Sequence, residues 1–211
     1  MARKKHIENP DYPFHLSARC INREWFLRLD HTWAIMQDFL YLISRQFDIE
    51  IYSFVLMANH FHLIARFPGS NMAPAMQYFL RETSRQIAKD AGRINQVYSS
   101  RYFRSCLTSF HYLTHAYKYV YRNPVEAGCC RYVEEYEFST LSGLLGMRQI
   151  VIPVVDDEIL FENVECTLDW LNEKPDIESY QFVKTALSRP VFKLSKIRST
   201  RESNPLEIVR Y

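Results

Sequence analysis

Two apolar segments separated by only two residues constrain the fold of this 211-residue chain more than any other feature. The first, IEIYSFVLM, covers residues 49–57, and the second, HFHLIARF, covers residues 60–67. β-Branched and aromatic side chains dominate both segments, and Ala58 and Asn59 form the break between them. Two such segments joined by so short a connection are typical of an antiparallel β-hairpin. The sequence therefore predicts a hairpin over residues 49–67.

Two histidines flank a single phenylalanine at the start of the second segment. Successive side chains of a strand point to opposite faces, so His60 and His62 are expected on one face and Phe61 on the other. Two imidazoles placed in this way can bind one metal ion. The other interpretation is one solvated histidine beside one that is hydrogen-bonded in the sheet, and short metal motifs produce many false positives. The spacing alone leaves both interpretations open.

Hydrophobic periodicity predicts strands and helices on both sides of the hairpin. In chain order the predicted elements are a strand at 13–21, a helix at 30–47, the hairpin, a helix at 71–91, a strand at 100–110 and a helix at 111–123. Asp30 is a suitable N-cap for the first helix. Pro124 is expected to end the last one, because proline disfavours helical geometry in the preceding residue. This order predicts an α+β split βαβ sandwich, an antiparallel sheet of four to five strands with helices on one face.

The predicted helix at 111–123 is rich in tyrosine, and its periodicity sorts the side chains into two faces. A four-residue spacing places His111, His115, Tyr119 and Asn123 on one stripe with Tyr112 beside it, and Tyr117 and Tyr121 on the opposite side. An amphipathic helix with exposed polar tips would have the same pattern. A zinc site built on the HxxxH pair of this stripe is a further alternative, but it lacks obvious additional ligands.

Charge is distributed unevenly along the chain, although the net charge is only +2. Residues 1–145 contain 17 Lys and Arg against 13 Asp and Glu, whereas residues 146–211 contain 9 against 11. An anionic partner is therefore expected to bind the first part. The 14 tyrosines and 14 phenylalanines could stack on unpaired bases, although most of them must fill the core.

Hydrophobic content, the length of apolar stretches and cysteine spacing limit the class of protein. The chain is 47% hydrophobic, which is enough for a real core, but no apolar stretch approaches the roughly 20 residues of a membrane helix. The basic start is not followed by the apolar region of a signal peptide, so a cytoplasmic location is expected. The 5 cysteines have no CxxC spacing, which argues against both a disulfide framework and a zinc knuckle.

Four stretches together resemble one protein family. These are the start MARKKHIENPDYPFHLSAR, the histidine strand LMANHFHLI, SRYFRSCL before the last predicted helix, and YVYRNPVEAG within it. Their order and separations are similar to those of the single-tyrosine HUH transposases, specifically the REP-associated tyrosine transposases of the insertion-sequence 200 type. The resemblance spans residues 1–143, so an HUH nuclease domain is expected over 1–145 and a C-terminal extension over 146–211.

The resemblance implies a ferredoxin-like nuclease that cleaves single-stranded DNA beside hairpins. Such an enzyme forms a 5′-phosphotyrosine link and frees a 3′-hydroxyl. By position, the family's histidine pair corresponds to His60 and His62, and its nucleophile corresponds to Tyr119. Asn123, one turn later, is expected to complete the metal site. The family implies Mg²⁺ or Mn²⁺, although imidazole ligands by themselves suit manganese, zinc or nickel better than magnesium.

The expected partner is single-stranded DNA with REP-like hairpins, bound by a monomer or a homodimer. Phosphate contacts are expected from basic side chains of the first part, namely Arg3, Lys4, Lys5, Arg81, Arg85 and Arg101. Solvated charges on a helix face are the other interpretation of the Arg81 and Arg85 row. Two further functions remain open: a catalytically silent DNA- or RNA-hairpin-binding protein, and a hydrolase using a zinc-bound water.

The C-terminal extension divides by charge. Residues 146–178 contain 2 basic against 9 acidic side chains, and residues 179–211 contain 7 against 2. Residues 156–178 are expected to be helical, with a further helix after Pro175. The final basic segment is expected either to contact DNA or the acidic helix, or to be a solvated extension.

Overall fold

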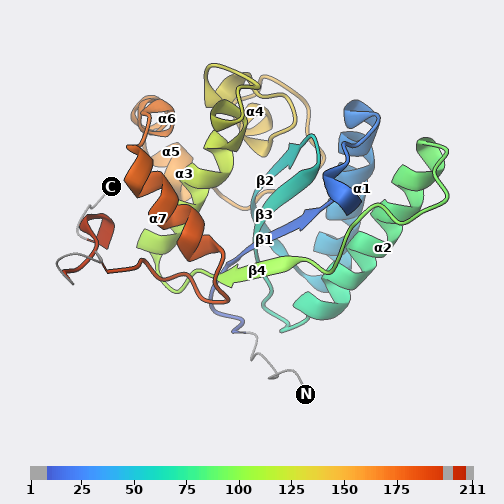
Figure 1. Cartoon of the computed structure of the whole chain (residues 1–211), viewed down its shortest axis with the longest axis horizontal. Helices are drawn as coiled ribbons and strands as arrows, with labels where there is room; N and C mark the ends of the chain where they lie inside the picture. The colour runs from blue at the N-terminus through green and yellow to red at the C-terminus, as the bar shows by residue number, and fades with distance from the viewer. Residues whose placement is uncertain (1–8, 197–201, 208–211) are drawn as a thin grey trace.

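The structure is a computed structural model that describes residues 9–196 and 202–207. Its centre is a four-stranded antiparallel sheet in the order β2-β3-β1-β4 (Figure 1). The strands are β1 (Phe14–Arg19), β2 (Glu50–Met57), β3 (His60–Arg66) and β4 (Phe103–Cys106). The predicted hairpin is confirmed, because β2 pairs with β3 along their whole length and only Ala58 and Asn59 connect them.

Two long helices connect the strands and cover one face of the sheet. Helix α1 (Leu29–Phe47) joins β1 to β2, and helix α2 (Met72–Asp90) joins β3 to β4. The element order β-α-β-β-α-β with this strand order is the ferredoxin-like fold. Buried side chains of both helices pack with one set of strand residues, including Leu16, Phe61 and Leu63. The predicted α+β class and antiparallel sheet are confirmed.

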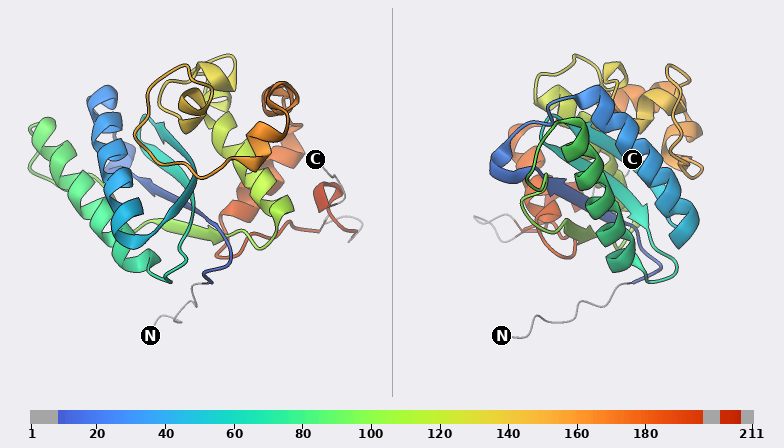
Figure 2. Two further views of the ribbon diagram at one scale, coloured as in Figure 1. Left: turned by 180° about the vertical axis from the view of Figure 1, so that it is seen from behind. Right: turned by 90° about the vertical axis from the view of Figure 1, so that its right-hand side faces the viewer.

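The expectation of helices on one face only is incomplete. Helix α3 (Phe110–Glu126) covers the opposite face, as the two views of Figure 2 make clear. The reason lies in the hairpin itself, where Val55 and Ile64 are fully buried on the face away from α1 and α2. A strand that is apolar on both faces needs cover on both. The continuous apolar run of residues 54–57 was the signal for this second layer.

The ends of two helices differ from the sequence-based expectation. Helix α1 begins one residue earlier than expected, so that Arg28 takes the N-cap position and Asp30 lies in the first turn. There its carboxylate still lies near the positive end of the helix dipole. Helix α3 continues through Pro124 to Glu126. Proline removes only its own N–H, and the next turn closes where the Ala127 N–H bonds the Asn123 carbonyl at 3.0 Å.

The C-terminal extension is mostly helical and packs on the α3 side of the sheet. Its helices are α5 (Glu158–Glu162), α6 (Val164–Asn172) and α7 (Ile177–Leu187), and the short α4 (Thr140–Leu144) precedes them. Single-turn 3₁₀ helices lie at Ile21–Arg23, Val133–Glu135 and Pro205–Glu207. One hydrophobic cluster combines side chains of the sheet, α3 and the extension. The division of the chain at residue 145 stays a prediction.

The first part of the basic tail is packed against the protein. The Pro190 carbonyl accepts from the Cys106 N–H at 3.0 Å, and the Phe192 N–H donates to the Cys106 carbonyl at 2.9 Å. Phe192 and Leu194 are buried. The tail therefore runs along the open edge of β4, and this portion is not a solvated extension. Within the described ranges, no helix has the length and apolar character needed to cross a bilayer.

Phe61 provides a test of how the sheet is stabilised. Its fully buried ring lies 5.7 Å from that of Phe54 and 5.6 Å from that of Phe79, measured between ring centroids. We expect Phe61→Ala to lower the free energy of unfolding by about 3–5 kcal/mol, because it leaves a cavity between sheet and helices. Urea denaturation measures this loss. Trp25→Ala, at a side chain that is 70% exposed, should change stability by less than about 0.5 kcal/mol.

Candidate active site

The face of the sheet beneath α3 carries three histidines. His60 and His62 lie on this face of β3, with ring centroids 4.9 Å apart. The third, His15, comes from the neighbouring strand β1, and its Nε2 lies 2.8 Å from Nδ1 of His62. Phe61 points the other way, into the cluster beneath α1 and α2. The strand alternation thus separates the two histidines of β3 from the ring between them.

Sequence reasoning missed His15. The signal was present in the alternation of PFHLSAR, where Phe14 and Leu16 are buried on one face and His15 and Ser17 point to the other. In the register, Ser17 lies opposite His62. What the strand could not indicate is that β1 would pair beside β3, since that pairing joins residues far apart in the chain.

Hydrogen bonds orient the two histidines of β3. The Asn59 Oδ1 atom lies 2.7 Å from His60 Nδ1, and the Asn59 amide nitrogen donates to the Arg23 carbonyl at 3.2 Å. Since this Oδ1 only accepts, His60 carries its proton on Nδ1 and has a lone pair on Nε2. The buried Nε2 of His62 has no hydrogen bond of good geometry to any described residue. Both Nε2 atoms are therefore the candidate ligand atoms.

Burial keeps all three imidazoles neutral. It lowers the pKa of His15 to about 3, with a smaller contribution from His60. Burial and then the positive charge of Arg19 lower the pKa of His60 to about 4. The pKa of His62 falls well below its usual value, first through burial and then through its two histidine neighbours, and the Asn123 side chain opposes the fall. Neutral imidazoles are the form that binds metal ions.

Helix α3 brings Tyr119 over the histidines. The Tyr119 ring meets the ring of His62 edge-on at 5.8 Å and that of His15 at 6.5 Å. Ser109 is the N-cap of this helix, and its hydroxyl accepts from the Tyr112 N–H at 3.1 Å. Burial raises the pKa of Tyr119, whereas hydrogen bonds from Tyr180 and Asn123 lower it. The nucleophile expected from the sequence therefore faces the histidine pair.

The other tyrosines of this helix have structural roles. The Tyr117 hydroxyl donates to the Asp157 carboxylate at 2.5 Å, and the Tyr121 hydroxyl lies 2.9 Å from the Thr140 hydroxyl. Both rings are buried on the side away from Tyr119, as the helical period predicts.

Asn123 lies one turn after Tyr119. Its amide nitrogen donates to the Tyr119 carbonyl at 2.8 Å, which leaves its side-chain oxygen as the candidate ligand atom. Its side chain also lies close enough to the His62 imidazole and the Tyr119 hydroxyl to raise the pKa of the first and lower that of the second. The structure thus brings together the four residues expected from the sequence, His60, His62, Tyr119 and Asn123.

The expected DNA-binding residues are not all at this site. Arg81 and Arg85 lie on α2, which covers the other face of the sheet, and both pair with Glu82. Arg101 is exposed before β4. Arg3, Lys4 and Lys5 lie outside the described residues. A role in DNA binding stays a prediction for all of them.

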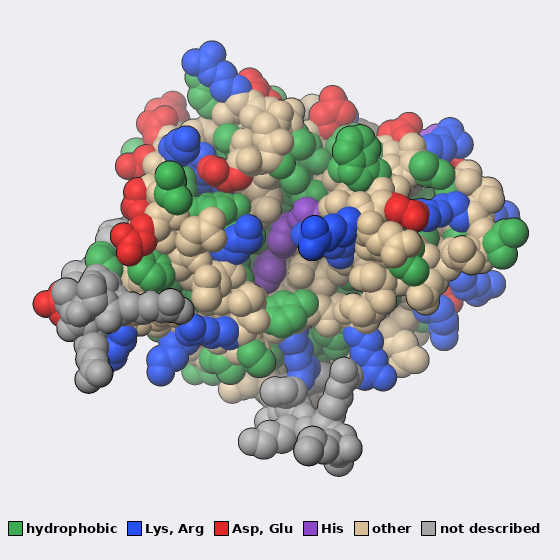
Figure 3. All heavy atoms as spheres, in the orientation of Figure 1, with side chains coloured by type: hydrophobic (Ala, Val, Ile, Leu, Met, Phe, Trp, Pro, Cys, Tyr) green, Lys and Arg blue, Asp and Glu red, His purple; other side chains and the backbone are tan. Residues whose placement is uncertain are grey.

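Arg19 is a basic residue at the site that sequence reasoning missed. It lies opposite His60 in the register of β1 and β3, and its charge lowers the pKa of both His60 and Tyr119. In Figure 3, His side chains are visible at the centre of this face, with Lys and Arg side chains on both sides. The opening above the histidines is therefore flanked by positive charge, which suits a phosphate.

The donor set fits a divalent ion with an incomplete protein shell. Within residues 9–196 and 202–207, no group of three or more His, Cys, Asp or Glu side chains has the arrangement of a closed metal site. The orphaned Nε2 of His62, the Nε2 of His60 and the oxygen of Asn123 could supply part of a shell. The remaining positions would be open to water or substrate oxygens, as in catalytic metal sites.

The ferredoxin-like fold and the histidines beneath Tyr119 agree with membership of a transposase family. Residues 10–123 match the family described as "Transposase IS200 like", and the chain belongs to this family. The resemblance seen in the sequence motifs is confirmed. No curated protein matches the chain.

A solved structure shares the fold. It is a REP-associated tyrosine transposase bound to a REP hairpin, with 19% sequence identity and a TM-score of 0.58. The match covers 74% of this chain and 93% of the other.

The histidine cluster makes stability depend on pH. A histidine with a pKa of about 3 in the folded protein and about 6.5 in the unfolded chain contributes stability above pH 6.5, which is lost as the pH falls toward 3. Between pH 6.5 and 5, protonation of His15 in the unfolded chain should by itself lower the free energy of unfolding by up to about 2 kcal/mol. We expect the free energy of unfolding of His15→Gln, measured by urea denaturation, to fall less over this pH range than that of the wild type. A fall parallel to that of the wild type would contradict the neutral, buried state of His15.

Proposed function

We propose that this protein is a metal-dependent single-stranded DNA endonuclease and strand transferase that acts at hairpin-flanked sites through a 5′-phosphotyrosine intermediate. The observation that carries the proposal is the ring of Tyr119 held 5.8 Å from the ring of His62, above a pair of neutral histidines. A tyrosine hydroxyl and two imidazoles in one opening provide a nucleophile and ligands for an electrophilic ion.

The chemical step exchanges one phosphodiester bond for another. The Tyr119 oxygen attacks phosphorus and loses its proton, the bond from phosphorus to the 3′-oxygen breaks, and the 3′-oxygen leaves as a hydroxyl after taking up a proton. His60, His62 and Asn123 would hold a divalent ion, Mg²⁺ or Mn²⁺, which supplies positive charge to a non-bridging phosphate oxygen when bound. Arg19 lies beside His60 and would add charge for the phosphate.

The phosphotyrosine keeps the energy of the broken bond. A 3′-hydroxyl can therefore attack the same phosphorus later, release Tyr119 and join two strands without ATP. The related fold is that of a transposase bound to a REP hairpin, which supports a hairpin-bearing single strand as the partner. All the proposed site residues come from one chain, so a monomer is sufficient for the chemistry and a homodimer is compatible with it. We infer a cytoplasmic location together with this DNA substrate.

The proposed nucleophile can be tested with Tyr119→Phe. The variant loses one hydroxyl and keeps the ring, so it should fold and bind hairpin DNA with unchanged affinity. It should form no detectable covalent adduct, because the rate of adduct formation should fall by roughly 10³-fold or more. Incubation with end-labelled single-stranded hairpin DNA and Mn²⁺, followed by a denaturing gel, measures the adduct.

Tyr112→Phe is the matched control, because this tyrosine is on the same helix and its hydroxyl bonds Glu207 instead. It should form the adduct at the rate of the wild type. A stable adduct in Tyr119→Phe would refute the assignment. Free cleaved product without an adduct would instead indicate hydrolysis by water, and a bound but intact strand would indicate a silent hairpin-binding protein.

The metal site can be tested without DNA. We expect isothermal titration calorimetry to detect one Mn²⁺ per chain in the wild type and a loss of at least about tenfold in affinity in His62→Ala, because a ligand is removed. His111→Ala alters a histidine of the α3 pair and should bind normally. Loss of binding in His111→Ala with normal binding in His62→Ala would move the metal site to that pair.

A further inference from the structure

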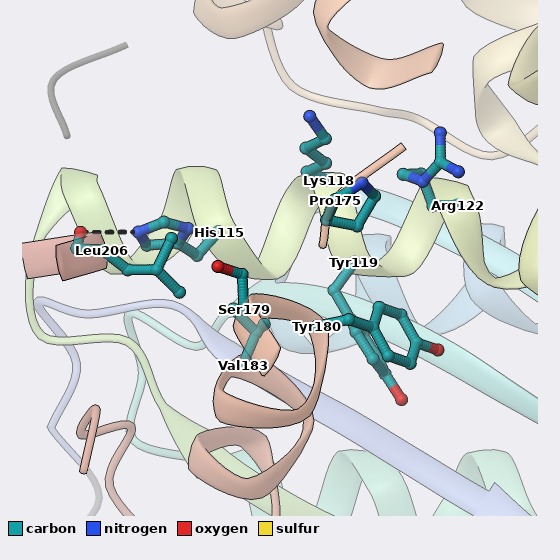
Figure 4. A pocket seen from close by; sticks show the side chains of 9 residues that line it. All are labelled: His115, Lys118, Tyr119, Arg122, Pro175, Ser179, Tyr180, Val183 and Leu206. Atoms are coloured by element: carbon teal, nitrogen blue, oxygen red, sulfur yellow. Dashed lines mark hydrogen bonds between the residues drawn. The ribbon is translucent and has the colours of Figure 1, made fainter. Parts of the chain in front are cut away.

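A tyrosine of the C-terminal extension lies against the proposed nucleophile. The ring of Tyr180, on α7, stacks on the ring of Tyr119 with 5.5 Å between centroids and 29° between planes. Figure 4 shows the two side chains reaching from facing helices and pointing the same way, at one end of a cleft lined also by Arg122 and Ser179. The ring of Tyr119 is thus held between the histidines of the sheet and Tyr180 of α7.

Helix α7 is a rigid support for this contact. Asp176 is its N-cap, and the carboxylate of this residue accepts from the Ser179 N–H at 2.8 Å. Val183 and Leu187, on the following turns, are buried in the cluster that includes α3. Beyond the helix, the chain at Pro190 is hydrogen-bonded to β4. The N-cap orders the first turn of α7, and the half of the helix that follows Tyr180 is anchored by buried side chains and by the bonds of the next segment to β4.

The helix that carries the nucleophile also holds the extension. Arg122, one turn after Tyr119 on α3, is 3% exposed. Its guanidinium donates to the carbonyls of Leu171 and Asn172 at 2.9 and 2.8 Å, which are the last residues of α6. It also pairs with Glu126 on its own helix. Unbonded carbonyls at a helix end are good acceptors for a cation. The position of α6, and of α7 after it, is thus tied to α3.

We propose that Tyr180 is a positioning residue for the nucleophile and that the C-terminal extension completes the active site through it. The inference rests on the proposed function of Tyr119. An unsupported tyrosine on a helix surface exchanges between rotamers, whereas the Tyr119 ring is held by its stack on Tyr180 and its edge-on contact with His62. Holding a reactive group in one orientation removes part of the entropy cost of reaction. The family match ends at residue 123, so Tyr180 belongs to a part of the chain outside it.

Three variants of Tyr180 test the proposal in single-turnover reactions at saturating hairpin DNA. Tyr180→Phe keeps the stacked ring but removes the hydrogen bond that lowers the pKa of Tyr119, so it should form the adduct more slowly than the wild type and faster than variants that lack the ring. Tyr180→Ala and Tyr180→Leu remove the stack and should lower the rate roughly tenfold while DNA affinity stays unchanged. Tyr41→Ala is the matched control, since this tyrosine is 43% exposed on α1 beneath the other face of the sheet.

A DNA-independent measurement separates this inference from the proposed function. Nitration of tyrosines by tetranitromethane, mapped by mass spectrometry, should modify Tyr119 faster in Tyr180→Ala and Tyr180→Leu, but not in Tyr180→Phe or Tyr41→Ala. Unchanged nitration of Tyr119 or unchanged adduct rates would overturn the inference. Faster adduct formation in Tyr180→Ala would also overturn it, because α7 would then block the nucleophile. A wild type without adduct but with the expected nitration pattern would refute the proposed function and leave the contact established.

Discussion

The alternation of side chains along β3 is the constraint on which the rest of this structure depends. Phe61 packs between Phe54 and Phe79 on one face, and His60 and His62 therefore point to the other. A register shift of one residue would place imidazoles in the core and a phenyl ring in the opening. The hydrophobic packing that stabilises the sheet thus also fixes the face on which the two histidines lie. A change in the register of β3 would alter both the core and the histidine site.

Helix α3 converts these histidines into a buried, neutral cluster. By covering the second face of the sheet it removes water from His62, lowers the pKa of the imidazoles and brings Tyr119 edge-on to them. A buried polar atom without a hydrogen bond of good geometry, such as Nε2 of His62, has a cost in free energy. Sites of this kind persist where a ligand or a reaction uses the atom, which agrees with the metal site that we propose.

The C-terminal extension packs against the same helix. Its side chains share a hydrophobic cluster with α3, and Arg122 bonds the end of α6. The nucleophile's helix is therefore packed on both sides, by the sheet below and by the extension above. This arrangement holds the helix that carries Tyr119 in one place, although the last turn of that helix contains Pro124.

The sequence by itself determined the local structure and much of the candidate site. Period-two and helical patterns placed His60 and His62 on one face of a strand, and Tyr119 and Asn123 on one stripe of a helix, because the face of a side chain within its own element depends only on local geometry. Only the tertiary structure decided which elements meet. It brought His15 and Arg19 from β1 and Tyr180 from α7 to the site, placed α3 on the second face of the sheet, and left Arg81 and Arg85 on the far side. Those contacts depend on the pairing and packing of segments far apart in the chain, and no local periodicity encodes them.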